Sequence, residues 1–349
     1  VLVVGGVALD MTSTISKSSK DFTSLLHTSS PGHIKQTLGG VGRNVCEAAM
    51  RTGAPAFLVS AVGDDLAAQT VRQGMQEIGM VYNAIHSNSG QLIAAVADMD
   101  IFDIIDSDKV EKNFLFDKRI DMVKAILHSE KTSLVCFDGN ITAKIMATIA
   151  ETSVQLGIPV FFEPTSVPKS LKIFEQPSTA ITSGAIKFVS PNQYELEAMS
   201  ETARKTLTTD NISRNTLSDE AYTLSIKAPA QVERMFPHAL HLSHMIPNVI
   251  TKLGEDGCFY TGRSPTTNEP FIHYFEPEEV DHVISVTGAG DCFVGTLVAN
   301  LRKHLAYIQP DNAMLWKQII SRAQQAAVLT LQSDLAVSPN INKTLLYAN

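Results

Sequence analysis

The chain has 349 residues, of which 44% are hydrophobic and 18% charged, and its formal net charge is −8. This length and apolar content suit one large α/β domain, or two medium ones, with a sizeable core, and they exclude a disordered chain. The acidic balance argues against nucleic-acid and membrane-surface partners, because both require a basic face. We therefore expect a small-molecule ligand.

Membrane and redox signals are weak. No apolar run approaches the roughly 20 residues of a membrane span, and no basic-then-apolar leader opens the chain, which together predict a cytoplasmic protein. The cysteines have no CxxC spacing and each lies in an apolar run, so we expect reduced core residues. They are Cys46, Cys136, Cys258 and Cys292.

Strand-like and helix-like segments alternate along the chain. We predict strands at residues 1–6, 56–62, 133–137 and 159–162, and helices at 45–51, 66–78, 142–156, 192–207 and 323–331. Continuous apolar strands separated by amphipathic helices indicate a mostly parallel sheet that is covered on both faces. The expected fold is a doubly wound α/β domain spanning residues 1–349.

Two stretches break this alternation. Residues 11–38 are rich in Ser, Thr and Lys, and residues 83–100 end in the strand-like segment 91–98. Neither pattern suits a crossover helix, so we expect both to form a small β lid outside the main sheet. Residues 208–217 are polar and predict a surface loop.

The segment VTGAGD at residues 286–291 runs directly into an apolar helix. Gly288, Ala289 and Gly290 allow backbone N–H groups to converge on an anion at a helix N-terminus, which predicts a phosphate cradle. Asp291 would repel phosphate, but it is suited to take a proton from an attacking hydroxyl. The alternative is a tight turn in which Asp291 caps the helix.

Two N-terminal motifs suggest a substrate site. GGVALD at residues 5–10 places Asp10 after the first strand, where doubly wound sheets bind ligands, although a turn or cap residue is an alternative. In GGVGRN, Gly39 and Gly40 allow a close backbone approach, and Asn44 can both donate to and accept from sugar hydroxyls. The alternative is a glycine-rich connection with a solvent-facing Asn. A dinucleotide fingerprint and a P-loop are both absent.

Two further motifs could contact a nucleotide. Asn192 and Glu195 in SPNQYE share a helix face and could order waters around a magnesium–phosphate ion, but an ordinary helix cap explains the same spacing. TKLGEDG at residues 251–257 is a strand leading into a glycine turn, suited to a nucleotide edge or to a plain hairpin.

In their order and spacing, these motifs resemble the ribokinase-like (PfkB) family of carbohydrate and nucleoside kinases. The resemblance implies ATP and Mg²⁺, with Asp291 as the base and the amides of Gly288, Ala289 and Gly290 as an anion hole. It further implies substrate binding by Asp10, Gly39, Gly40 and Asn44. The ATP-binding residues it implies are Asn192, Glu195 (through a water on Mg²⁺), Thr251, Lys252, Gly254 and Thr287.

Within the family, FDGN at residues 137–140 and FEPTSVPK at residues 162–169 are similar to the pseudouridine kinase branch. Ala8 stands where ribokinases typically have Asn, so ribose is less expected. The implied reaction is phosphorylation of the 5′-hydroxyl of pseudouridine. Alternatives are a kinase for adenosine, ribose or a fructose-like sugar, and a catalytically silent nucleoside-binding module, against which the intact Asp291 argues.

The resemblance leaves the cation and the partners open. Ser285 stands where potassium-activated members often have Asp, so activation by a monovalent cation is in doubt. The kinase can be fused behind a pseudouridine-monophosphate glycosidase, which would account for the start at Val1. A homodimer formed through the lid is a further expectation.

Overall fold

The computed structural model describes residues 1–15, 31–80, 82–86, 124–125, 127–128, 132–175, 179–206 and 228–348. Within these residues, the main sheet has the strand order β11-β10-β9-β8-β7-β6-β1-β4-β5. The strands are β1 (Leu2–Val4), β4 (Phe57–Val62), β5 (Tyr82–His86), β6 (Val135–Asp138), β7 (Val160–Glu163), β8 (Ile186–Val189), β9 (Asn248–Lys252), β10 (Cys258–Arg263) and β11 (Pro270–Phe275). All pairs from β5 across to β9 are parallel, whereas β10 is antiparallel to both of its neighbours. The expected mostly parallel sheet is confirmed.

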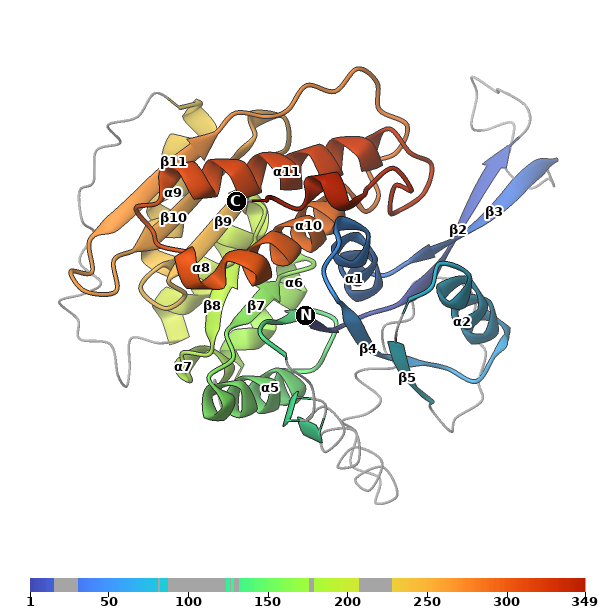
Figure 1. Ribbon diagram of the computed structural model, residues 1–349, viewed down its shortest axis with the longest axis horizontal. Helices are drawn as coiled ribbons and strands as arrows, with labels where there is room; N and C mark the ends of the chain where they lie inside the picture. The colour runs from blue at the N-terminus through green and yellow to red at the C-terminus, as the bar shows by residue number, and fades with distance from the viewer. Residues whose placement is uncertain are drawn as a thin grey trace.

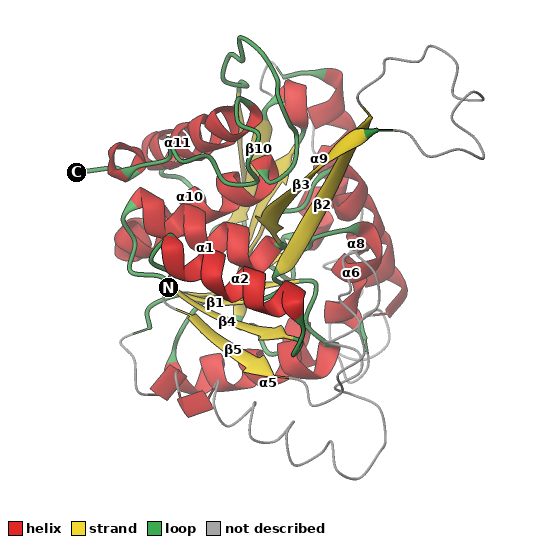
Figure 2. Ribbon diagram, turned by 90° about the vertical axis from the view of Figure 1, so that its right-hand side faces the viewer, coloured by secondary structure: helices red, strands yellow, loops and turns green. Residues whose placement is uncertain are grey.

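Alternate residues of the central strands enter two different hydrophobic cores. In β1, Leu2 and Val4 face one core while Val3 faces the other. The first core is completed by α5 (Ala143–Leu156), α7 (Thr179–Thr182), α8 (Gln193–Thr206) and α9 (Ala230–Leu242), and the second by α1 (Val41–Thr52), α2 (Leu66–Glu77), α10 (Ala289–His304) and α11 (Ala313–Leu331). Figure 2 shows sheet strands lying between α1 and α2 on one side and α5 on the other. The chain is therefore doubly wound, as predicted.

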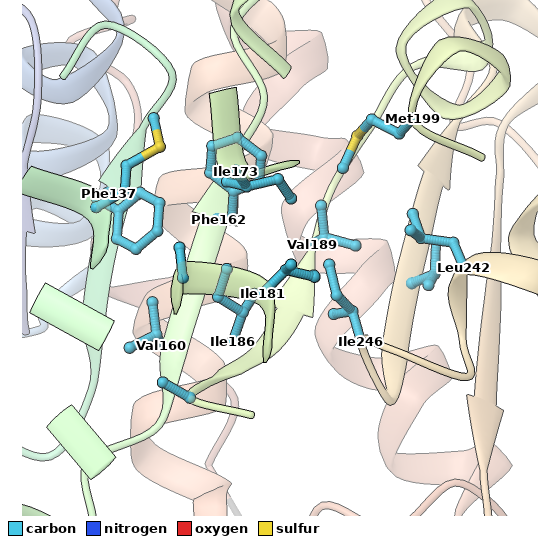
Figure 3. Packing of buried hydrophobic residues seen from close by; sticks show 14 of the residues in the cluster. Phe137, Val160, Phe162, Ile173, Ile181, Ile186, Val189, Met199, Leu242 and Ile246 are labelled. Atoms are coloured by element: carbon cyan, nitrogen blue, oxygen red, sulfur yellow. The ribbon is translucent and has the colours of Figure 1, made fainter. Parts of the chain in front are cut away.

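The first core is built on bulky residues of the central strands. Phe137 and Phe162 are fully buried and their ring centroids lie 5.3 Å apart, and Figure 3 shows them together with Val160, Ile186 and Val189. Because β6 and β7 each end one residue after these rings, the packed phenylalanines fix the positions of the two following carboxylates.

The lid is a separate two-stranded antiparallel sheet. It consists of β2 (Ala8–Ile15) and β3 (Gly32–Gly39), and Figure 1 shows both strands extending away from the main sheet. The lid thus starts before residue 11 and includes Asp10, which pairs with Thr37. Lys35 of β3 contacts the carboxylate and the backbone carbonyl of Asp334, in the loop after α11, so the lid also touches the body of the domain.

The second predicted lid segment is partly wrong. Residues 83–86 of the expected 83–100 lie in β5, which pairs in parallel with β4 as an edge strand of the main sheet. The alternation of strand and helix continues through α2 into this strand, so no lid is needed to explain it. The remaining residues of that segment, including 91–98, and the polar stretch 208–217 lie outside the described residues.

Two boundaries near the site also differ from the sequence prediction. Helix α1 begins at Val41 rather than at residue 45, since Gly40 adopts φ +90° and ends the preceding strand sharply. The predicted helix at 323–331 is the second half of the longer α11.

The four cysteines are free and buried, as expected. Burial raises the pKa of the Cys46 and Cys292 thiols to about 12, so both stay protonated near neutral pH. No helix in the described ranges has the length and apolarity needed to span a bilayer.

Candidate active site

The candidate site lies at the carboxyl ends of the parallel strands. Asp138, Glu163 and Lys252 are the last residues of β6, β7 and β9, and the N-terminal ends of α1 and α10 meet at the same edge. Helices α1 and α10 can pack this closely because of Gly295, where a Cβ atom would clash with the backbone of α1. The sequence predicted the site at this edge of the sheet.

The predicted phosphate cradle lies in the first turn of α10. Gly288 is the N-cap residue with φ +80°, and a side chain there would collide with the carbonyl oxygen of Ala336. At Gly290, in contrast, an added Cβ would meet only the Lys252 ammonium, at 4.0 Å. No described residue accepts a hydrogen bond from the backbone amides of Gly290 and Asp291. These two amides are therefore open to an anion at the positive end of the helix dipole, whereas the amide of Ala289, which was predicted to belong to the cradle, donates to the carbonyl oxygen of Val286 at 3.5 Å.

Asp291 is not the cap of α10. The N-cap residue is Gly288, which has no side chain. The Asp291 carboxylate instead accepts a hydrogen bond of 2.7 Å from the side-chain amide of Asn44. Burial raises the pKa of Asp291 to about 6, although the Asn44 bond and the Lys252 charge act in the opposite direction. A carboxylate with a raised pKa that borders an anion cradle is suited to general-base chemistry.

The orientation of the Asn44 amide is fixed from its other side. Arg43 donates to the Asn44 side-chain oxygen at 2.6 Å and to the carbonyl oxygen of Leu38 at 2.7 Å, and it forms an ion pair with the buried Glu47. Arg51 holds the second oxygen of Glu47 at 2.7 Å. Because the amide oxygen of Asn44 faces Arg43, its NH₂ group must face Asp291. Asn44 does not face solvent.

The other predicted substrate residues come together at the base of the lid. The Asp10 carboxylate covers Gly39, where a side chain would collide with it. Gly40 has no room for a Cβ either, since that atom would lie 2.5 Å from the Cα of Val7. Burial raises the pKa of Asp10, and the nearby Arg43 opposes this rise. Asp10 and Gly39 thus lie together at the base of the lid, and Asn44, in the helix that follows Gly40, contacts Asp291 beside the cradle.

Lys252 and Glu163 form an ion pair that the sequence reasoning missed. The Lys252 ammonium lies 3.1 Å from both carboxylate oxygens of Glu163. Burial raises the pKa of Glu163, while the charge of Lys252 acts in the opposite direction. For Lys252, burial disfavours the charge, but Glu163 and then Glu195 outweigh it and raise the lysine pKa. The lysine is therefore a cation beside the cradle.

A second missed group surrounds Asp138. Its carboxylate accepts hydrogen bonds from the Gly6 amide, at 2.8 Å, and from the backbone and side-chain amides of Asn140. The side-chain oxygen of Asn140 in turn accepts a hydrogen bond of 2.6 Å from the Lys169 ammonium. Thr165 has φ +70°, an unusual conformation for a β-branched residue, and its hydroxyl accepts a hydrogen bond from Gly139. The sequence did contain a signal for Asp138, because a carboxylate at the end of a parallel strand lies where doubly wound sheets bind ligands. The same argument was applied to Asp10.

Asn192 and Glu195 form a reciprocal cap on α8. The Asn192 side-chain oxygen accepts from the amides of Tyr194 and Glu195, and one Glu195 oxygen accepts from the Asn192 amide at 2.8 Å. The capping explanation is thus correct, yet the second Glu195 oxygen accepts from no described side chain or amide. Among the described residues there is no cluster of three His, Cys, Asp or Glu side chains that could hold a metal. These residues fit Mg²⁺ bound mainly to phosphates, with Glu195 holding one of its waters.

The remaining predicted nucleotide residues are spread along the site. TKLGEDG forms a hairpin, since β9 and β10 pair through a turn that starts at Gly254, and this pairing leaves the predicted contact with a nucleotide open. Thr251 is fully buried in β9, and its hydroxyl has no hydrogen-bond partner within the described ranges. Thr287 is exposed next to the cradle, with its amide 3.2 Å from the Ser285 hydroxyl.

Comparisons with known proteins agree with this fold. The model of the pfkB family of carbohydrate kinases matches residues 10–343. The chain therefore belongs to the pfkB carbohydrate kinase family, a family of phosphotransferases. It resembles the solved structure of ribokinase from Cryptococcus neoformans in complex with ADP, with a TM-score of 0.63, 15% identity, and coverage of 98% of this chain and 97% of the other. At that identity the likeness shows the fold.

Two curated relatives are more similar in sequence. The pseudouridine-metabolizing bifunctional protein of Schizosaccharomyces pombe is 29% identical, over 99% of this chain and 47% of its own length. The chain thus spans about half the length of that relative. The pseudouridine kinase of Escherichia coli is 25% identical, over 86% of this chain and 82% of its own length.

Proposed function

We propose that the chain transfers the γ-phosphoryl group of ATP to the 5′-hydroxyl of pseudouridine, with Asp291 as the catalytic base. The observation that carries this proposal is the 2.7 Å hydrogen bond between Asn44 and Asp291, because it joins the expected sugar-binding motif to the base beside the phosphate cradle. The two relatives that are named for pseudouridine support the choice of nucleoside.

The reaction in this proposal is an in-line displacement. Asp10 and Asn44 bind ribose hydroxyls and hold the 5′-oxygen beside Asp291, which accepts its proton. The amides of Gly290 and Asp291, together with the dipole of α10, stabilise charge on the transferring phosphoryl group. The lid strands β2 and β3 exclude water that would otherwise hydrolyse ATP. Catalysis then depends chiefly on positioning.

The expected cation is Mg²⁺, which neutralises charge on the β- and γ-phosphate oxygens when bound. Glu195 is the residue proposed to hold it through a water, with Asn192 fixing the Glu195 carboxylate by the cap. Ser285 replaces the acidic residue expected of potassium-activated members, so we propose activity without added potassium. Comparing kcat after dialysis into a sodium-only and into a potassium-only buffer would test this.

A substrate screen tests the proposal. ATP consumption is measured with pseudouridine, uridine, adenosine, ribose and fructose, and the expected preference is for pseudouridine. A preference for adenosine or for a free sugar would leave a kinase with a different acceptor. Calorimetric binding of nucleosides without ATP consumption would instead indicate a silent binding module.

Partners and location stay predictions. Met11 and Ile34 are 45% and 68% exposed on the lid strands, which supports a homodimer formed through the lid. Sedimentation of the wild type and of the Ile34→Lys variant would test it, since a lid dimer should dissociate in the variant. An upstream glycosidase domain, a single domain over residues 1–349 and a cytoplasmic location are likewise expectations from the sequence.

A further inference from the structure

The ion pair of Lys252 and Glu163 crosses the sheet over an intervening strand. Glu163 ends β7 and Lys252 ends β9, while β8 lies between them and is hydrogen-bonded to both strands. Backbone hydrogen bonds therefore already join these strands, and the ion pair is not needed to hold them together. A buried ion pair also adds little net stability, because removing both charges from water offsets their attraction. The fold alone gives no reason for this pair.

The ammonium of Lys252 has an unused donor. It carries three N–H bonds, and Glu163 accepts at most two of them, through contacts of 3.1 Å to each oxygen. No other described residue accepts from it. The Lys252 side chain is only 18% exposed, so protein surrounds most of it. Bulk water can therefore do little to solvate the third N–H bond.

The free side of the ammonium adjoins the cradle. The Lys252 nitrogen is 4.0 Å from the position that a Cβ atom on Gly290 would occupy, and Gly290 has no other neighbour there. The amides of Gly290 and Asp291 open on the same space. An anion bound by these amides would therefore meet the third N–H of Lys252.

We propose that Lys252 binds the transferring phosphoryl group, and that Glu163 is the positioning residue that holds the Lys252 ammonium against the cradle. This inference rests on the proposed kinase function. In the transfer, the bond from the 5′-oxygen to the γ-phosphorus forms, and the bond from that phosphorus to the β,γ-bridging oxygen breaks. The hydroxyl proton passes to Asp291, and ADP leaves with the electron pair of the broken bond. Lys252 stays protonated throughout and interacts with the phosphoryl oxygens.

Glu163 acts in this scheme only through Lys252. Both Glu163 oxygens face the lysine, and the carboxylate is buried, so it does not itself reach the anion, which it would repel. By fixing the lysine rotamer, Glu163 removes the need to order a flexible side chain during the reaction. The two residues should therefore behave as one unit in kinetics.

A double-mutant cycle tests this directly. Lys252→Met should lower kcat by roughly 10²–10³-fold, as for loss of one preorganised donor, with a smaller change in the KM for the nucleoside. Glu163→Gln should lower kcat by about tenfold or more in the wild-type background but cause no further loss in Lys252→Met. Lys252→Arg should recover part of the activity, whereas Lys187→Met, at an exposed lysine of β8, should have no effect. Additive losses from Glu163→Gln and Lys252→Met would overturn the positioning role.

Nucleotide binding supplies a readout that needs no acceptor. Calorimetry should show that Lys252→Met weakens ATP binding more than ADP binding, because only ATP has the phosphoryl group that Lys252 contacts. An equal loss for both nucleotides would place Lys252 away from that group and overturn the inference. If the wild type shows this ATP preference yet phosphorylates no nucleoside, the proposed function fails while the lysine contact stands. The double variant Glu163→Gln/Lys252→Met, which removes both buried charges, covers the case in which a single variant does not fold.

Discussion

The side-chain amide of Asn44 donates a hydrogen bond of 2.7 Å to the carboxylate of Asp291, and the two residues are 247 positions apart in the chain. Asn44 lies in the first turn of α1 and Asp291 in the first turn of α10, so the contact joins the N-terminal ends of two packed helices. Arg43 fixes the amide from behind. This arrangement fixes the direction of the carboxylate and partly offsets the rise in its pKa that burial causes.

The pH dependence of the reaction should report on Asp291. The base must be deprotonated, and burial raises its pKa to about 6, so kcat/KM should fall about tenfold per pH unit below that value and level off above it. The Asn44 hydrogen bond lowers this pKa, so Asn44→Ala should move the acidic limb to higher pH. Asn340→Ala, at an exposed position, is the matched control. A limb that stays in place in Asn44→Ala would contradict the role of the hydrogen bond.

Gly288 should be intolerant of a side chain. Gly288→Ala combines a left-handed backbone with a clash against Ala336, and should lower the thermal midpoint by several degrees. Gly157→Ala provides the control, since Gly157 has φ +66° but no heavy atom within 4 Å of an added Cβ. Scanning calorimetry of the two variants should show the larger loss for Gly288→Ala. Equal losses would mean that the loop around Ala336 yields readily.

Asp10 should contribute to acceptor binding rather than to ATP binding. Its carboxylate lies at the base of the lid, against Gly39. A hydrogen bond to a charged group contributes about 1.5–3 kcal/mol, so Asp10→Ala should raise the nucleoside KM by roughly 10- to 150-fold. The Kd for ATP should change little, as in the exposed control Asp311→Ala. Comparable losses for both ligands would contradict this division of the site.

Pseudouridine should be preferred over uridine. The two nucleosides share a ribose and differ in an N–H group near the glycosidic bond, so a polar acceptor in the site must provide the discrimination. A buried acceptor left unpaired costs about 1–3 kcal/mol, which corresponds to roughly 5- to 150-fold in kcat/KM. Competition between the two nucleosides measures this ratio, and equal use would reduce the proposal to a kinase of unassigned acceptor.

Much of the fold could be predicted because strands and helices carry different hydrophobic periods. The strands around Val3 and Phe161 are continuously apolar, and the helices that follow them are amphipathic, so the covered parallel sheet follows from local patterns. Strand β5 was missed because nothing in residues 82–86 distinguishes a parallel edge strand from a lid strand. That difference lies in its partner, β4, to which β5 is joined through α2.

The site was predicted less completely than the fold. Glycines and the Asp291 carboxylate have local signatures, since a helix start after small residues predicts an anion cradle. The ion pair of Glu163 with Lys252 and the contact of Asn44 with Asp291 depend on side chains that meet only after folding. Asn192 and Glu195 illustrate a second difficulty, because the same spacing suits both a helix cap and a magnesium site, and the sequence alone does not distinguish them.

The central claim is that Asp291 is the base of a pseudouridine kinase, and one comparison of rates tests it most directly. Formation of pseudouridine 5′-phosphate is measured for the wild type and for Asp291→Asn, with nucleoside affinity determined by calorimetry on the same samples. The Asn side chain keeps an oxygen that can accept from Asn44, so binding should be nearly unchanged while kcat falls by roughly 10²- to 10⁴-fold. Near wild-type turnover in Asp291→Asn, or no phosphorylation of pseudouridine by the wild type, would contradict the claim.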